Sequence, residues 1–468
     1  MEKRITNEST ASYSAKAIKK LPFIAVAASL IFLFNANVNI IDILPDFIGY
    51  IILSIALVKF GDLNSEIEAS ARFFRYMICV DLSKYAALMW VFGTTKSDMQ
   101  NNAILLVAFV YAVIEVILLT IAFKKLFEGL AALGYTNQNT SILGSARAGG
   151  RTNTDKIRGF TFFFIFAKAA FSVLPEFAVL TTVEYTENSF VMYLYEYIGI
   201  MRLLAFFFGT IIGIVWIIGI FRYFKRIASD KVFVDSLILR YNTEIISKDG
   251  IFVRRNTEIA SLIYIFALVF MFDLKFESVN IIPDFIAAIL CLFGIVSFIR
   301  VSRSKCYFLA LPAVIYAITS IIAQYVEIGF FDKYYYGAVF RAPEVYNAYV
   351  KMCVFSTVSV VSCALTFVSL IIVLCKIVDV HTGVGLGLND EREAARLFES
   401  RRENKKKLFP LLIGALISVA CDIFCVFGAI SYGFADEVSI VGNIILLFCA
   451  IKTFGNLKDD IKAKYILE

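Results

Sequence analysis

Five ionisable side chains lie inside stretches of the chain that are otherwise apolar, and they are its best candidates for chemistry. They are Asp81, Lys84, Glu115, Lys168 and Asp422. A charge at membrane depth is costly and commonly belongs to a substrate path, a proton relay or an ion pair. Asp81 and Lys84 share one helix face at a spacing of three, and we expect Glu115 to pair with Lys168 between neighbouring helices. Structural ion pairs that specify packing are the alternative to a substrate or proton path.

A second group of polar side chains surrounds a short string that occurs twice. LPDFI spans residues 44–48 and PDFI spans residues 283–286, which places the two prolines 238 positions apart (283 minus 45). Proline and aspartate suit a first helical turn, because proline lacks the N–H that has no partner there and the helix dipole favours a carboxylate. The polar residues in and before the two boxes are Asn35, Asn39, Asp46, Asp273, Asn280 and Asp284.

The apolar segments before the two boxes are short. Residues 21–34 and 259–272 hold 14 positions each, against the roughly 20 that a membrane-spanning helix needs. Short segments at matching places in two halves of a chain are typical of transporters, in which broken helices line a central site. A substrate or ion site at the boxes is therefore one interpretation. A helix-start signal used twice is the other, because external turns use the same residue types.

Other kinds of site find no support in the sequence. The chain has one histidine, His381, and no spaced cluster of metal-ligating residues, so we expect no metal site. The nine cysteines contain no CxxC pair, no nucleophile elbow is present, and the glycine-rich stretch 383–387 is not followed by the GK[ST] of a phosphate-binding loop. We expect no enzyme, no catalytic residue, no cofactor and no nucleic-acid partner.

The composition indicates a membrane protein. Hydrophobic residues make up 59% of the 468 positions and charged residues 18%, against roughly 45–50% and about 25% in soluble domains. So few polar residues cannot cover soluble cores of this size. We expect an all-α, polytopic membrane protein whose partner is the lipid bilayer, with a small molecule or an ion as its substrate if it transports. Nothing in the sequence indicates an oligomeric state.

Twelve apolar segments are predicted to cross the membrane. Their approximate bounds are 21–41, 44–60, 73–93, 103–123, 160–181, 199–221, 259–273, 281–299, 306–328, 348–376, 408–430 and 438–454. With twelve spans, both termini and every even-numbered loop share one side. That side carries most of the lysines and arginines, so we expect it to be the cytoplasmic side of the plasma membrane.

The repeated box predicts two parallel six-helix repeats. The expected division is a cytoplasmic N-terminus (1–20), a first half (21–224), a cytoplasmic linker (225–257), a second half (258–456) and a cytoplasmic tail (457–468). The string VNII occurs at 38–41 and at 279–282. This match implies that the second copy has lost a three-residue spacer before its box.

Two resemblances accompany these patterns. The string NIIDILPDFIGYIIL at 39–53 resembles a box of multi-pass membrane proteins of Gram-positive bacteria, a family that implies no particular activity. Two six-helix halves joined by a basic linker are also similar to the major facilitator arrangement. However, the loop after the second span, GDLNSEIEASARFFR, lacks that superfamily's GxLxDRxGR-type signature, so this likeness is an analogy of layout.

These observations favour a secondary transporter or permease for a small solute. We expect its cavity between the halves, near the two boxes, and transport by rocking of one half against the other. The alternative is a membrane scaffold, or an envelope or sporulation assembly protein, without transport. A polar cavity lined by Asn35, Asp46, Glu115, Asp284 or Asp422 favours transport, whereas a closed bundle that uses them as caps or pairs favours the scaffold.

Overall fold

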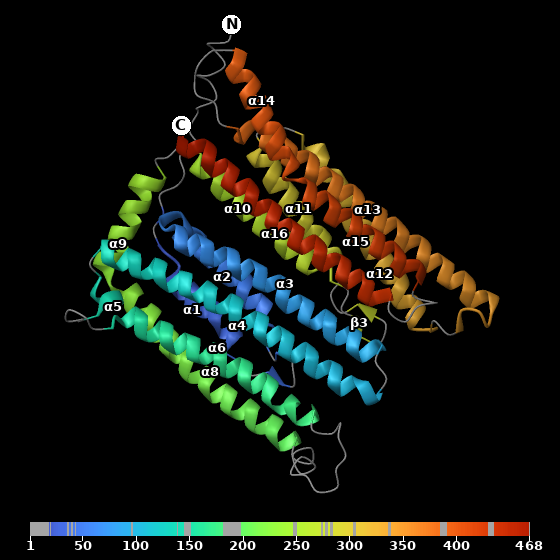
Figure 1. Ribbon diagram of the computed structural model, residues 1–468. Helices are drawn as coiled ribbons and strands as arrows, with labels where there is room; N and C mark the ends of the chain where they lie inside the picture. Colours follow the sequence, from blue (N-terminus) through green and yellow to red (C-terminus); the bar gives the residue numbers. More distant parts are fainter. Residues whose placement is uncertain are drawn as a thin grey trace.

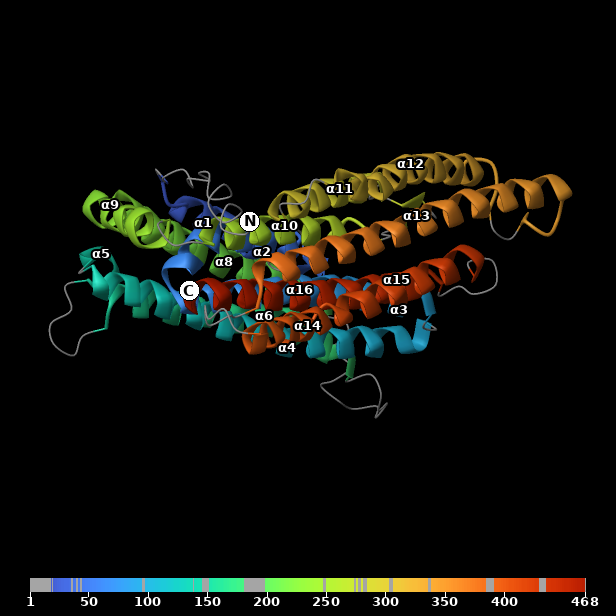
Figure 2. The same cartoon turned by 90° about the horizontal axis from the view of Figure 1, so that it is seen from above.

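A computed structural model of the chain shows a bundle of long helices whose axes lie roughly side by side (Figures 1 and 2). It describes residues 18, 20–34, 37–38, 41–42, 44–94, 97–137, 139–144, 151–180, 198–246, 250–272, 275–276, 279–280, 284–302, 306–335, 338–383, 391–428 and 435–467.

The first part of the chain forms a closed ring of helices, hereafter the first ring. In order these are α1 (Phe23–Ser29) with the 3-10 turn η2 (Leu30–Leu33), α2 (Asp46–Leu63), α3 (Ser65–Thr94), α4 (Ser97–Thr136), α6 (Asn153–Leu180) and α8 (Ile198–Ser229). Each helix packs on the next one, and α8 packs back on α1. The short helix α5 (Thr140–Leu143) lies between α4 and α6 in the chain.

The last part of the chain forms a second ring by the same rule. Its helices are α10 (Ile251–Val269), α11 (Asp284–Val301), α12 (Leu311–Phe331) after the turn η4 (Tyr307–Ala310), α13 (Pro343–His381), α15 (Phe409–Gly428) and α16 (Ala435–Leu467). Here α16 closes the ring by packing on α10. Helix α14 (Glu391–Lys406) extends away from this ring near the C-terminus (Figure 1).

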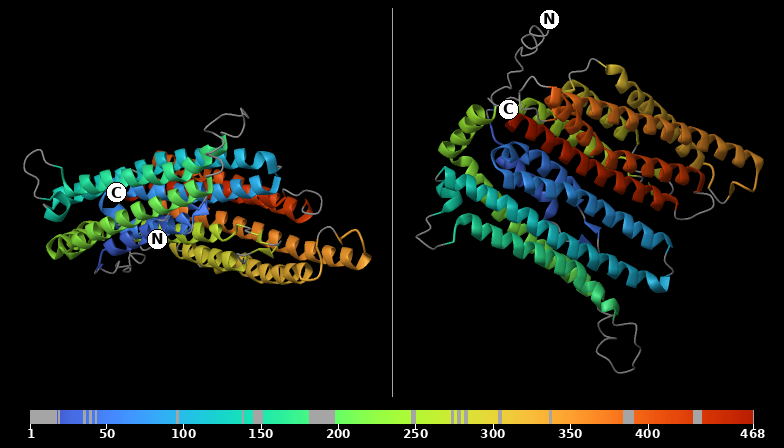
Figure 3. Two further views of the ribbon diagram at one scale, coloured as in Figure 1. Left: turned by 90° about the horizontal axis from the view of Figure 1, so that it is seen from below. Right: turned by 45° about the horizontal axis from the view of Figure 1, so that its top comes forward.

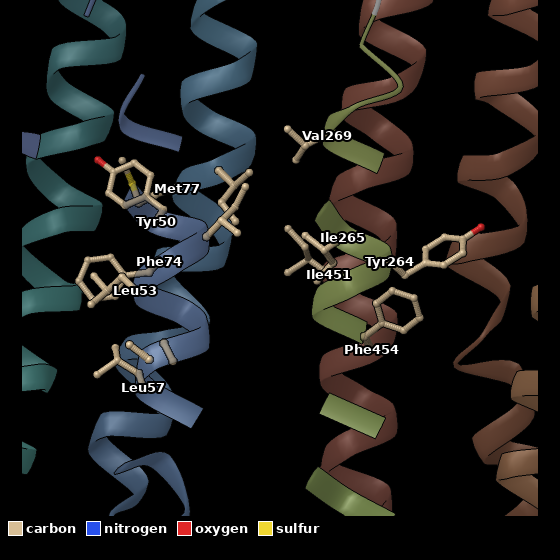
Figure 4. Packing of buried hydrophobic residues seen from close by; sticks show 14 of the residues in the cluster. Tyr50, Leu53, Leu57, Phe74, Met77, Tyr264, Ile265, Val269, Ile451 and Phe454 are labelled. Atoms are coloured by element: carbon tan, nitrogen blue, oxygen red, sulfur yellow. The ribbon is translucent and has the colours of Figure 1, made fainter. Parts of the chain in front are cut away.

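The two rings meet along one joint, at which α3 packs on α16 and α2 packs on α10. Figure 4 shows Tyr50, Leu53 and Leu57 of α2 beside Phe74 and Met77 of α3, and across from them the buried side chains of the second ring. Those are Tyr264, Ile265 and Val269 of α10 and Ile451 and Phe454 of α16. Close packing of this kind holds membrane helices together, because lipid supplies no hydrophobic drive between them.

A β-hairpin whose strands have two residues each precedes the second helix of each ring. β1 (Asn37–Val38) pairs antiparallel with β2 (Ile41–Asp42), and β3 (Lys275–Phe276) pairs antiparallel with β4 (Val279–Asn280). Both strands and both 18-residue helices, α2 and α11, recur at the separation of 238 residues that also divides Pro45 from Pro283. The expected loss of a spacer is therefore wrong, and the two VNII strings are not structurally equivalent.

Among the described residues, eight helical stretches are long and apolar enough to cross a membrane: α4, α6, α8, α11, α12, α13, α14–α15 and α16. The chain is thus a polytopic helical membrane protein. Helices α2, α3 and α10 coincide with predicted spans but are not among these eight; α2 and α10 each carry three charged residues within fewer than 20 positions. The first predicted span, 21–41, is wrong at its end, because the helix stops at Leu33 and β1 and β2 follow.

The stretch expected as a linker is largely helical. It begins inside α8, continues as α9 (Lys231–Arg240) and a π-helical turn (Tyr241–Ile245), and ends inside α10. Phe233, Leu237 and Tyr241 bury one face of this segment, and Asp230 caps α9 by accepting a hydrogen bond from the backbone N–H of Phe233. Figure 3 shows α9 at the end of the bundle that also holds α5. The expected tail, 457–468, is for the most part the last turns of α16.

Candidate functional site

A cluster of buried charges lies inside the first ring, where four helices meet. Lys168 on α6 contacts Asp46, the first residue of α2, with 2.7 Å between Nζ and Oδ2. Lys84 on α3 lies 3.1 Å from Asp81 Oδ1 and 3.2 Å from Glu115 Oε1 on α4. Asp81 also accepts the backbone N–H of Phe47 at 2.8 Å, so it caps the start of α2 from outside. These five charged groups are the first-ring cluster.

The first-ring cluster is closed. The side chains of Lys84 and Asp81 are each 2% exposed, and the cavity beside Asp46, Glu115 and Lys168 measures about 10 Å³. A single water needs roughly 10–15 Å³, so this space does not admit a solute. The pairing of Asp81 with Lys84 is confirmed. The expected partner of Glu115 is wrong: Glu115 contacts Lys84, while Lys168 reaches across the ring to Asp46.

The second ring holds a larger and more polar cavity, hereafter the acidic cavity. Its volume is about 110 Å³, and α11, α12, α13 and α15 form its wall. Three carboxylates line it, namely Asp284, Glu327 and Asp422, and no basic side chain does so among the described residues. The neutral polar residues of the wall are Tyr316, Gln324, Ser356, Ser359, Cys363 and Cys425. Each of the four helices contributes at least one polar group.

The two sites occupy corresponding places in their rings. Asp46 and Asp284 each begin the helix that follows a β-hairpin. The fifth helix of the first ring, α6, brings an ammonium group to Asp46 through Lys168. The fifth helix of the second ring, α15, instead brings a carboxylate, Asp422, to the cavity that Asp284 lines. Asp422 accepts a hydrogen bond from Ser439 on α16, with 2.6 Å between the oxygens.

Other residues expected at this site fall in two groups. Asn35, Asn39 and Asp273 lie outside the described residues, and Asn280 is placed by its backbone in β4.

The acidic cavity lies inside the second ring, since all of its lining residues belong to that ring. This polar cavity thus lies within one ring, whereas the sequence led us to expect a polar cavity between the halves. The joint where it was expected is filled by apolar side chains and, at one end, by charges.

Those charges form a second cluster, which the sequence analysis missed. Lys458 on α16 lies 2.7 Å from Glu258 on α10 and 3.1 Å from Glu68 on α3. Arg254 on α10 lies 3.1 Å from the same Glu68 carboxylate. Glu258 also pairs with Arg75, and Arg254 with Asp62. This joint cluster ties α2 and α3 of the first ring to α10 and α16 of the second.

The basic side chains of the joint cluster strongly affect the pKa of Glu68. Glu68 lies before the predicted span 73–93. Burial raises the pKa of its carboxyl, but the nearby Lys458, Arg254 and Lys462 outweigh burial and lower this pKa to about 2. The only sequence signal for such a cluster is that its members lie within a few residues of span ends, where charges normally face water.

Comparison of the chain with protein-family profiles, with curated proteins and with solved structures finds no match.

Proposed function

We propose that this chain is a membrane transporter for a small cation and that the acidic cavity is its binding site. The observation that supports the proposal is a difference in charge between the two rings at corresponding places. In the first ring a lysine ammonium neutralises the carboxylate that begins the second helix. In the second ring a cavity with three carboxylates in its wall stands at the corresponding place.

The size and chemistry of the acidic cavity fit such a ligand. At roughly 10–15 Å³ per water, a volume of about 110 Å³ holds a monovalent metal ion with several waters, or a small organic amine. Carboxylates grouped in a low-dielectric wall attract a positive charge. Hydroxyl and amide groups of Gln324, Ser356 and Ser359 supply further oxygen ligands.

The contacts at the joint limit how the two rings could move during transport. Rocking of one half against the other would break the buried ion pairs of the joint cluster and separate the packed faces of α2, α3, α10 and α16. Removing one partner from a buried ion pair costs about 3–5 kcal/mol. We therefore infer that the first ring and the joint form a fixed frame. Access to the acidic cavity would then be controlled within the second ring, by α12, α13 and α15.

We further infer that the two rings are copies of one six-helix unit in the same orientation, which together make twelve spans in the plasma membrane with both termini in the cytoplasm. The recurrence of hairpin, box and helix at a separation of 238 residues supports this duplication, as does the identical order in which the helices of each ring contact one another. The basic even-numbered loops support the orientation.

A scaffold without transport is the second candidate. The closed first-ring cluster favours it, because there the charges serve as helix caps and ion pairs. In this case the acidic cavity would be a water-filled space without a ligand.

Cation-dependent thermal unfolding of the purified full-length protein distinguishes the two candidates. Sodium, potassium, ammonium and choline chlorides are compared with N-methylglucamine chloride at equal ionic strength. A cation at one hundred times its Kd stabilises a protein by about 2.7 kcal/mol, so we expect at least one of the four to raise Tm by several degrees.

The variant Asp422→Asn should lose this rise in Tm. Asp379→Asn is the matched control, since Asp379 is a half-exposed carboxylate on α13 that pairs with Lys405 far from the cavity wall. A flat response to all four cations would favour the scaffold, and so would a rise in Tm that Asp422→Asn leaves intact.

A further inference from the structure

A groove on the outer surface of the bundle lies beside the joint, between α2 and α10. Its volume is about 250 Å³. Its wall is almost entirely apolar and is made by Pro22, Ile55, Val58, Ile259, Leu262, Ile263 and Phe266. Ile55 and Ile259 are 54% and 40% exposed, so this wall faces the surroundings of the bundle. In a membrane protein such a wall contacts lipid acyl chains.

Two basic side chains complete the groove at one end. Lys59 belongs to the last turns of α2 and Arg255 to the first turns of α10, and both line the groove. The positive charge of Arg255 repels the positive charge of Lys59. The adjacent Arg254 points the other way, into the joint cluster, where it pairs with Glu68 and Asp62.

No carboxylate of the described residues pairs with Lys59 or Arg255. Lys59 donates to the backbone carbonyl of Lys20 at 3.4 Å, which leaves its charge uncompensated. Two cations therefore stand together at the end of an apolar groove. Their side of the bundle is the one on which the sequence places the basic loops. Anionic lipid headgroups concentrate at such a surface, and basic pockets between membrane helices bind them.

We propose that this groove binds an anionic phospholipid of the surrounding bilayer. Lys59 and Arg255 contact the phosphate of the headgroup, and one acyl chain lies along Ile259 and Ile263. Since α2 belongs to the first ring and α10 to the second, the bound lipid bridges the two rings on the lipid side of the joint. This inference is independent of whether the acidic cavity binds a cation.

Native mass spectrometry of the full-length protein in detergent tests the site, with phosphatidylglycerol and phosphatidylcholine as probes. We expect the wild type to retain phosphatidylglycerol in preference to phosphatidylcholine. The double variant Lys59→Gln/Arg255→Gln should bind phosphatidylglycerol at least tenfold more weakly. The matched control is Lys124→Gln/Lys231→Gln, which removes the same charge from exposed positions outside the groove and should bind as the wild type does.

A second variant keeps the proposal testable if the double variant fails to fold. Ile259→Trp fills the apolar part of the groove and leaves both cations in place, so it should also weaken retention of phosphatidylglycerol. Equal retention of the two lipids by the wild type would overturn the proposal. Undiminished binding of phosphatidylglycerol by Lys59→Gln/Arg255→Gln, or an equal loss in the control pair, would overturn it as well.

Discussion

Replacing Lys168 by methionine is expected to lower the free energy of unfolding by about 3–5 kcal/mol, which is the usual cost of removing one partner from a buried ion pair. The Lys168 ammonium lies 2.7 Å from the Asp46 carboxylate. Methionine has a similar length but no charge, so the buried carboxylate at the start of α2 loses the contact that compensates it. Chemical unfolding of the purified protein in detergent, followed by circular dichroism, measures the loss.

The same substitution in the background Asp46→Asn separates charge from packing. Because the asparagine needs no counter-charge, the double variant should recover most of the lost stability. Lys124→Met is the exposed control and should change stability by less than about 1 kcal/mol. A Lys168→Met protein as stable as the wild type would show that the pair with Asp46 does not hold the first ring together.

Glu68→Gln is expected to cost about 3 kcal/mol at pH 7, and this cost should disappear in acid. Nearby cations hold the pKa of Glu68 at about 2 in the folded protein, against the ordinary 4.5. Each tenfold change in the protonation equilibrium is worth about 1.36 kcal/mol, which gives the expected size. A carboxyl with a lowered folded-state pKa stabilises the protein above its unfolded-state value, and this stabilisation is lost as the pH falls through the folded-state value.

Unfolding measured in parallel for wild type and variant between pH 7 and pH 2 checks this. The difference in stability should be constant down to about pH 5 and should shrink from there to about pH 2. Glu66→Gln is the matched control two residues earlier on α3, since Glu66 is half-exposed and pairs with Lys125. A cost for Glu68→Gln that does not change with pH would contradict the account of the joint cluster.

The sequence predicts the fold class well because the membrane leaves few alternatives. Backbone groups in lipid must be paired within helices or barrels, so long apolar runs such as Leu203–Phe221 translate directly into helices like α8. The box also predicts where α2 and α11 begin. The hairpins were not predicted, since a pair of two-residue strands has too few positions to show alternation.

The partners that buried charges find on distant helices could not be predicted from sequence, unlike the pair of Asp81 and Lys84 within one helix. Lys168 finds Asp46 only because the first ring closes and brings α6 toward the start of α2. Lys458 and Glu68 meet because α16, the last helix, packs against α3, 390 residues away in numbering. Order along the chain gives no hint of such contacts. Asp284 and Asp422 were expected as site residues, but their common cavity inside one ring was not.

The rate at which charged thiol reagents modify Cys425 tests most directly whether the acidic cavity selects cations. Cys425 lines the cavity, and a variant that keeps it as the sole cysteine reports on that space. The reagents are aminoethyl and sulfonatoethyl methanethiosulfonate, with each rate divided by that reagent's rate with a free thiol. We predict that the cationic reagent reacts at least tenfold faster and that Asp284→Asn/Asp422→Asn removes the difference. Equal rates, or a faster anionic reagent, would contradict the account.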